Sequence, residues 1–206
     1  MDQDGKPSTT TPQDPQEWTR HPNLYYEDGT IVLLAKATLF RVYYGILSRE
    51  CEVFRGTSQL LEDRETHDGC PLVRLEDDPE LLAYFLQTLM GQIEILDSNE
   101  NVENEAPDRA LGILLFSHKY LAARYRKKAV KWFEDRIPEN IKEIDLTMAW
   151  DSLPWPRWTH ASLLSTEEPN PIAIFQECDL YRFLPMVEEE RRCLDSLGIV
   201  SPDLGR

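Results

Sequence analysis

The chain has 206 residues, a formal net charge of −15, and 41% hydrophobic and 10% aromatic residues. This length suits one hydrophobic core with an extension, and no apolar run approaches the roughly 18 residues that a membrane-spanning helix needs. The negative charge disfavours general binding to nucleic-acid phosphates or to an anionic membrane, because the long-range field repels both.

The N-terminal stretch MDQDGKPSTTTPQDP has no apolar central segment of the kind found in secretory signals. We therefore predict an intracellular protein, cytoplasmic or nuclear, with reduced thiols and no disulfide framework. The four cysteines are Cys51, Cys70, Cys178 and Cys193. Residues 1 to 17 are rich in proline, threonine, glutamine and aspartate and predict a mobile tail. We place the end of this tail at residue 20.

The first ordered segment carries aromatic residues around an expected turn at Pro22, and leads into a sheet through residues 24 to 26. The run from Thr30 to Ala35 is apolar on both faces and predicts a buried strand. A short connection at residues 36 to 38 joins it to a second apolar run, Leu39 to Tyr43, so a hairpin is expected. One or two short helices should then place Ile46, Leu47, Val53 and Phe54 against the sheet.

A third strand is predicted over CPLVRL, residues 70 to 75. Before it we expect a helix that closes at Leu60 and Leu61, and then the polar loop EDRETHDG, which ends in a turn at Asp68 and Gly69. Pro71 stands at the start of the strand, where a missing N–H costs least.

An amphipathic helix is predicted from Pro79 to about Met90, with cap candidates at residues 76 to 78 and a terminator at Gly91. Its apolar stripe is Leu82, Phe85, Leu86 and Leu89. Residues 97 to 108, DSNENVENEAPD, hold five acidic residues and no basic one, which is typical of a solvated mobile loop.

Two further helices are expected, from Ala110 to Tyr120 and from Tyr125 to Arg136, with Ala129, Trp132 and Phe133 inward and Pro138 ending the unit. Beyond Pro138 the composition shifts to a proline-interrupted segment with three tryptophans, which should fold back onto the main domain. One short helix over residues 172 to 183 and a last helix from Pro185 to Leu197 complete the prediction.

The order of these elements and several residue blocks resemble the BTB/POZ domain family, particularly its fungal members. The blocks are YEDGTIVL at 26 to 33, LFRVYYGIL at 39 to 47 with VFR at 53 to 55, DGCPLVRLED at 68 to 77 and LLFSHKYLAARYR at 114 to 126. The resemblance covers residues 21 to 137, and IAIFQECDLYRFLP resembles the helical extension of fungal members. It implies an α+β fold: a small three-stranded sheet with a cluster of helices, then a C-terminal helical extension over 138 to 206, packed on or beside the domain.

The chain departs from the family at two places. Family members often carry a histidine and a basic residue where this chain has Tyr43 and Tyr44, and the basic residue typically faces an acidic one equivalent to Asp28. We therefore expect Asp28 to meet Tyr44. Members that bind cullin scaffolds show a hydrophobic-any-Glu pattern, whereas this chain has Leu82-Ala83-Tyr84, so cullin binding is discounted.

The resemblance implies a non-enzymatic protein-interaction module, with a second copy of the chain among its candidate partners. Candidate interface residues are Asp28, Phe40, Tyr43, Tyr44, Leu47, Phe54, Leu82 and Tyr84. The alternative is an adaptor whose C-terminal helices recruit clients to a ubiquitin ligase or a transcription-regulating complex.

No catalytic constellation stands out in the sequence. The four histidines are scattered, no nucleophile motif or glycine-rich phosphate loop is present, and we expect no cofactor. His67 and Cys70 have the gap of a half zinc site without a second ligand pair, so no metal is expected.

Basic residues concentrate at one place in this acidic chain: Arg124, Arg126, Lys127, Lys128 and Lys131. The neighbouring aromatic residues fall on the expected buried side of the same helix, which disfavours nucleic-acid binding and leaves a solvated face or an acidic protein partner. The acidic loop 97 to 108 of another copy is one hypothesis for that partner.

Overall fold

A buried β-hairpin lies at the centre of the fold in this computed structural model, which describes residues 18–56, 65–93, 106–137, 170–185, 187–188 and 192. Strand β2 (Ile31–Ala35) is buried along its whole length and pairs antiparallel with β3 (Thr38–Val42), from Ile31 opposite Val42 to Ala35 opposite Thr38. Lys36 turns the chain between them with a left-handed φ of 51°. The predicted hairpin is confirmed.

The sheet is mixed and has five strands, in the order β1-β3-β2-β5-β4. The predicted third strand is β5 (Cys70–Leu75), which runs parallel to β2. The prediction of three strands was wrong because it missed both edges: β1 (Thr19–Tyr25), parallel to β3, and the two-residue β4 (Thr66–His67), antiparallel to β5.

Neither edge strand has the hydrophobic alternation from which strands are read. The expected turn at Pro22 is instead part of β1, at a place where the register with β3 is irregular. An edge strand tolerates proline because one row of its N–H groups has no ladder partner. The polar loop predicted before β5 contains β4, and the expected turn at Asp68 and Gly69 joins the two with positive φ at both residues.

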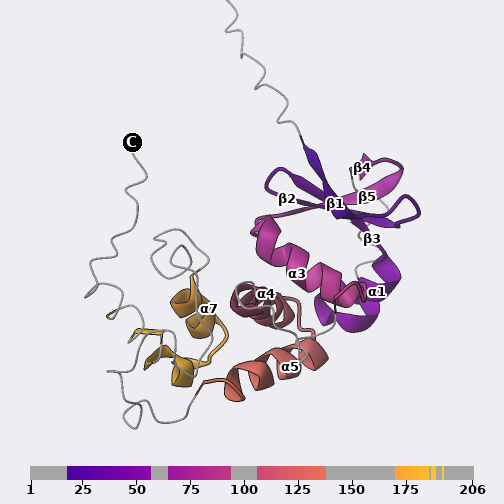
Figure 1. The fold of residues 1–206 in the computed structure, drawn as a ribbon. Coiled ribbons are helices and arrows are strands. Elements are labelled where there is room, and N and C mark those ends of the chain that lie inside the picture. The colour runs from indigo at the N-terminus through magenta and orange to yellow at the C-terminus, as the bar shows by residue number, and fades with distance from the viewer. Residues whose placement is uncertain are drawn as a thin grey trace, which may run out of the picture.

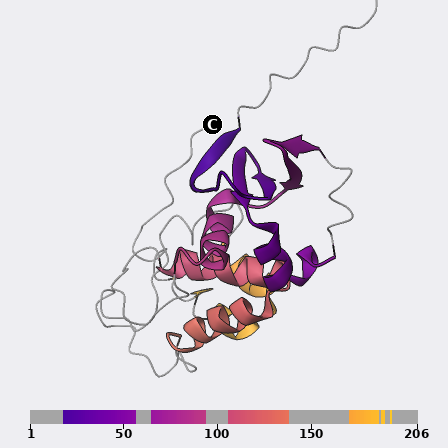
Figure 2. The same ribbon diagram turned by 90° about the vertical axis from the view of Figure 1, so that its right-hand side faces the viewer.

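The helices lie on one side of the sheet, as Figures 1 and 2 show. Helix α1 (Tyr44–Glu50) and the 3₁₀ turn η1 (Glu52–Phe54) follow β3 directly. Helix α3 (Pro79–Leu89) begins where Asp78 accepts hydrogen bonds from the backbone N–H groups of Glu80 and Leu81. It buries the predicted stripe of Leu82, Phe85, Leu86 and Leu89.

Helix α4 (Ala106–Lys119) packs between α3 and α5 (Ala123–Glu134). Its first turn covers residues 106 to 108, which the sequence assigned to the acidic loop. Gly112 allows α3 and α4 to approach closely, because a Cβ atom there would lie 2.7 Å from the carbonyl oxygen of Leu81. The inward positions predicted for α5, Ala129, Trp132 and Phe133, are buried.

The two faces of the sheet have separate apolar clusters. One side of β2, with Ile31 and Leu33, belongs to the large core that the helices complete. The opposite side, with Val32 and Leu34, packs with Leu39, Cys70 and Leu72 in a smaller cluster that Trp18 and Tyr25 partly cover. This is why β2 reads as an unbroken apolar run.

The described part of the C-terminal region packs against the helices. Helix α7 (Pro171–Glu177) lies against α4, and Phe175 and Phe183 join Phe133 of α5 in an aromatic cluster with ring centroids 5.1 to 6.0 Å apart. Arg126 donates a 3.0 Å hydrogen bond to the carbonyl of Cys178. The single short helix predicted here is two elements, since Asp179, at φ 59°, separates α7 from η4 (Tyr181–Phe183).

Several predictions fall outside the described residues: the N-terminal tail, the helix closing at Leu60 and Leu61, most of the acidic loop, the tryptophan-rich segment and most of the last helix. The described part has an α+β architecture. Across the described ranges, every helix is too short or too polar to cross a lipid bilayer.

Candidate functional site

Asp28 meets Tyr43, and the expected contact with Tyr44 was wrong. The Tyr43 hydroxyl donates a 2.7 Å hydrogen bond to Asp28. Tyr44 turns the other way, donating its hydroxyl to the carbonyl of Phe54 at 3.0 Å and its backbone N–H to the Thr30 hydroxyl at 2.9 Å. Tyr43 is still extended (φ −95°, ψ 111°) as the residue before α1, and successive side chains of an extended chain point in opposite directions.

Three segments meet beside this hydrogen bond. The rings of Tyr26 and Tyr43 lie 5.0 Å apart, centroid to centroid. Gln92, just after α3, donates 2.6 Å hydrogen bonds to the Tyr26 hydroxyl and to the carbonyl of Asn23. The result is a polar and aromatic surface made by the ends of β1, β3 and α3.

Half of the predicted interface residues belong to the core. Phe40, Leu47 and Leu82 are fully buried, and Phe54 is nearly so. Tyr44 and Tyr84 are half-buried, as is Tyr43, while Asp28 is exposed. Asp28 and the half-buried Tyr43 are therefore accessible at the surface, whereas Tyr44 points inward and the four buried residues lie in the core beneath.

The prediction that Val53 packs against the sheet was wrong. Val53 is 43% exposed and, with Leu121 at 52%, forms an exposed apolar pair that the sequence reasoning missed. We call it the Val53–Leu121 pair. Glu52 donates its N–H to the carbonyl of Leu121 at 3.5 Å, and Val53 donates to the carbonyl of Tyr120 at 3.4 Å, so η1 and the α4–α5 turn lie side by side. Of the described large hydrophobic residues, one other, Tyr181, is exposed to a similar degree.

Leu121 adopts a left-handed conformation with a φ of 56°. This conformation costs an L-residue about 1–2 kcal/mol, and it is a true outlier for a bulky side chain. The turn therefore holds a leucine in a strained conformation while presenting it to solvent. Nothing in the sequence signals this, because the turn lacks the glycine or asparagine that usually marks such a position.

A buried polar group supports this turn. The Asp77 side chain is 3% exposed and accepts hydrogen bonds from Lys119 and from the hydroxyl of Tyr120. Burial, and then the hydrogen bond to Asp77, raise the pKa of Tyr120 far above its ordinary value. Asp77 thus ties the segment before α3 to the residues that precede Leu121.

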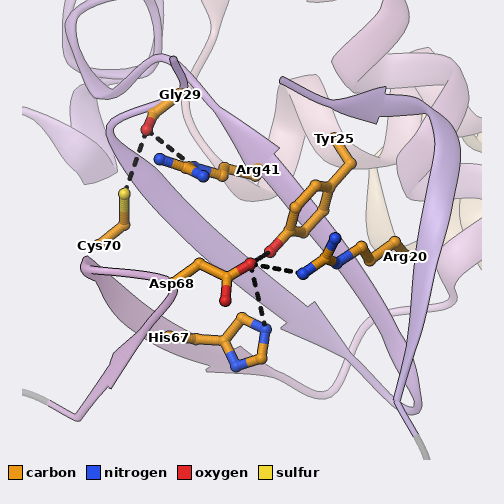
Figure 3. A network of polar contacts seen from close by, with 7 residues as sticks. All are labelled: Arg20, Tyr25, Gly29, Arg41, His67, Asp68 and Cys70. Carbon is orange, nitrogen blue, oxygen red and sulfur yellow. Dashed lines mark hydrogen bonds and ion pairs between the residues drawn. The ribbon is translucent and has the colours of Figure 1, made fainter. Parts of the chain in front are cut away.

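A second polar network connects the two edges of the sheet (Figure 3). Asp68, in the β4–β5 turn, accepts hydrogen bonds from Tyr25 at 2.6 Å and from Arg20 at 2.7 Å, both on β1. Since β1 and β4 are the two outermost strands, these contacts require the sheet to curl. The hydrogen bond from Tyr25, with the nearby Arg20 guanidinium, lowers the pKa of Asp68.

The cysteines and histidines in the described residues offer little chemistry. Cys51, Cys70 and Cys178 are buried free thiols, and burial raises the pKa of Cys51 and of Cys178 to about 12, so both are poor nucleophiles. Within the described ranges, His, Cys, Asp and Glu form no group of three or more that could hold a metal ion. His67 packs its ring against Trp18.

The basic cluster divides between two faces of α5. Arg126 points inward, bonding His118 Nδ1 at 3.3 Å in addition to the carbonyl of Cys178. The other four basic residues are exposed. The aromatic residues of α5, Tyr125, Trp132 and Phe133, are buried as expected.

No protein-family model matches the chain, and no curated protein matches it either.

Proposed function

We propose that this chain is a BTB/POZ-like protein-interaction module that carries out no catalysis of its own. The proposal rests on the sequence resemblance over residues 21 to 137 and on one structural observation, the exposed Val53–Leu121 pair. The half-buried Tyr43, with Asp28, provides a second accessible surface for a partner or for another copy of the chain.

The Val53–Leu121 pair supports the proposal because its exposure is energetically unfavourable on two counts. Each side chain is about half exposed and so forgoes about half of the roughly 1.5–3 kcal/mol that full burial of a valine or leucine provides. Leu121 adds backbone strain, which a glycine or an asparagine would relieve. Strain of this kind is concentrated at binding and switch positions in proteins.

A partner that covers the pair would recover the burial energy. Two side chains alone do not make a stable interface, which buries about 1,200 Å² or more in total. They serve as the anchor, and the exposed charged residues that flank them in the sequence, Glu52, Arg55 and Arg124, would supply the rim.

The experiment compares partner capture, read by quantitative mass spectrometry, for the full chain and for Val53→Thr/Leu121→Asn. Asparagine tolerates the left-handed conformation, so the variant should match or exceed the wild type in urea-unfolding stability while losing its partners. The control is Lys36→Asn, which relieves the backbone strain of another left-handed residue, in the hairpin turn. It also removes the ion pair with Asp78, which is exposed and contributes little to stability.

Retention of the same partners by Val53→Thr/Leu121→Asn would overturn the role of the pair. A wild-type chain that captures no protein above background, and that remains monomeric by light scattering at high concentration, would remove the proposal altogether.

The second candidate function is an adaptor that recruits clients through its C-terminal region to a ubiquitin ligase or a transcription-regulating complex. Tyr181, 59% exposed on η4, favours it, because η4 is held against the helices by the buried Phe183. Truncation at residue 137 is a poor test since it would uncover Phe133. Tyr181→Ser is the sharper variant, and unchanged partner capture by it would count against the adaptor.

A further inference from the structure

The exposed face of α5 carries a continuous basic stripe: Arg124, Lys127, Lys128 and Lys131. Positions i, i+3, i+4 and i+7 lie on one side of a helix, and they span about 10 Å at the helical rise of ~1.5 Å per residue. We call these four residues the α5 stripe. It begins three residues after Leu121, at the rim of the Val53–Leu121 pair.

Most of the α5 stripe has no counter-charge. Lys131 pairs with Asp135 at 2.8 Å, but Arg124, Lys127 and Lys128 make no ion pair with any residue in the described ranges. Most exposed cations elsewhere in the described chain are paired, as Arg20 is with Asp68 and Arg74 with Glu65. Arg55 is an exception, since it donates to the carbonyl of Arg49 at 3.4 Å and makes no ion pair in the described ranges. In a chain of net charge −15, three adjacent unpaired cations are unexpected.

The arrangement also destabilises its own helix. Like charges three and four residues apart on a helix repel each other. Arg124 also lies in the first turn of α5, where a cation interacts unfavourably with the helix dipole and no acidic residue offsets it. Local stability therefore does not account for the stripe, whereas binding of an anionic ligand would.

We propose that the α5 stripe docks an acidic polypeptide segment of a partner protein. The inference rests on the proposed function and adds the chemistry of the partner: aspartate and glutamate side chains facing the stripe, beside an apolar residue covering the Val53–Leu121 pair. Carboxylates on one face of a helix, or on alternate residues of an extended segment, match a span of about 10 Å.

Nucleic acid is the less favourable anionic ligand. Single-stranded nucleic acid uses exposed aromatic rings on which bases stack, and the three aromatic residues of α5, Tyr125, Trp132 and Phe133, are at most 6% exposed. The net charge of −15 repels a phosphate backbone more strongly than a short peptide of lower charge density.

The test measures binding of fluorescein-labelled octaglutamate to the full chain by anisotropy, at about 50 mM and about 200 mM salt. The variant Arg124→Gln/Lys127→Gln/Lys128→Gln neutralises the unpaired part of the stripe. The matched control Lys36→Gln/Arg49→Gln/Arg74→Gln removes three exposed cations elsewhere and changes the net charge equally. An oligothymidylate of the same charge serves as the competing anion.

We expect the wild type to bind octaglutamate at the lower salt, with an affinity that falls about tenfold at the higher salt. The affinity should also fall about tenfold in the stripe variant, and about twofold or less in the control. Equal weakening in the control, tighter binding of oligothymidylate, or no binding at low salt would each overturn the inference. A dimer that disappears in the stripe variant would overturn it as well, since the occupant would then be a second copy.

The test of the α5 stripe and the test of the proposed function can fail independently of each other. Octaglutamate has no apolar side chain, so Val53→Thr/Leu121→Asn should bind it as the wild type does. Octaglutamate binding together with unchanged partner capture in that variant counts against the Val53–Leu121 pair alone. Lost partner capture without octaglutamate binding counts against the α5 stripe alone.

Discussion

The Tyr43 hydroxyl lies 2.7 Å from Asp28 at the exposed end of the central hairpin, and the next residue, Tyr44, points inward to the carbonyl of Phe54. Two adjacent tyrosines therefore have separate roles, one at the surface and one in the structure. Substitutions can distinguish them.

Tyr44→Phe should lower the free energy of unfolding by about 0.5–1.5 kcal/mol, because it removes a partly buried hydrogen bond to the Phe54 carbonyl. Tyr43→Phe removes an exposed hydrogen bond and should change stability much less. Urea unfolding of both variants checks this. Equal effects of the two substitutions would contradict the assignment.

Gly112→Ala should destabilise the protein by about 1–3 kcal/mol, since the added methyl group would lie 2.7 Å from the Leu81 carbonyl oxygen and force α3 and α4 apart. Gly45→Ala is the matched control. It also lies in a helix, but nothing is within 4 Å of the added methyl group, so it should stabilise by up to about 1 kcal/mol. Two shifts of the same sign in thermal unfolding would refute the close approach.

Asp77→Ala should lower the free energy of unfolding by about 3 kcal/mol, because it leaves the buried Tyr120 hydroxyl without its acceptor and Lys119 without its counter-ion. Adding Tyr120→Phe should recover part of the loss, since the unsatisfied hydroxyl is then gone. A double-mutant cycle in urea measures the coupling. Strict additivity would show that the two side chains do not interact.

Asp68 should make the protein acid-sensitive. Its pKa in the folded protein is below the ordinary 3.8, chiefly because Tyr25 donates to it, so the folded state holds the proton more weakly than the unfolded state. The stabilisation is present above the unfolded pKa and is lost as the pH falls through the folded pKa.

Asp68→Asn should therefore flatten the fall in stability between about pH 5 and pH 2, and Tyr25→Phe should flatten it in part. Asparagine keeps the left-handed conformation of the turn residue, so the fold should persist. Thermal unfolding across this range is the measurement, and a slope identical to that of the wild type would disprove the role of Asp68.

Local signals were enough to predict the hairpin, β5 and α3. An unbroken apolar run marks β2, and an aspartate before a proline marks the start of α3, where Asp78 does cap the first N–H groups. The inward residues of α5 followed from helical periodicity alone. Each of these features depends on residues within a few positions of one another.

The missed features depend on partners far along the chain. β1 and β4 are strands because β3 and β5 offer them free backbone groups, and their own side chains give no alternating pattern. Phe40, Leu47 and Leu82 look like interface candidates in sequence, but packing between the sheet and the helices covers them.

The sequence by itself determined the acidic character of the chain, the central strands and the basic run on α5. The tertiary structure decided which tyrosine meets Asp28, and that the two segments carrying the exposed Val53 and Leu121 lie side by side. The physical reason is that periodicity reports which way a side chain faces within its own element, whereas exposure depends on what the rest of the chain places over it.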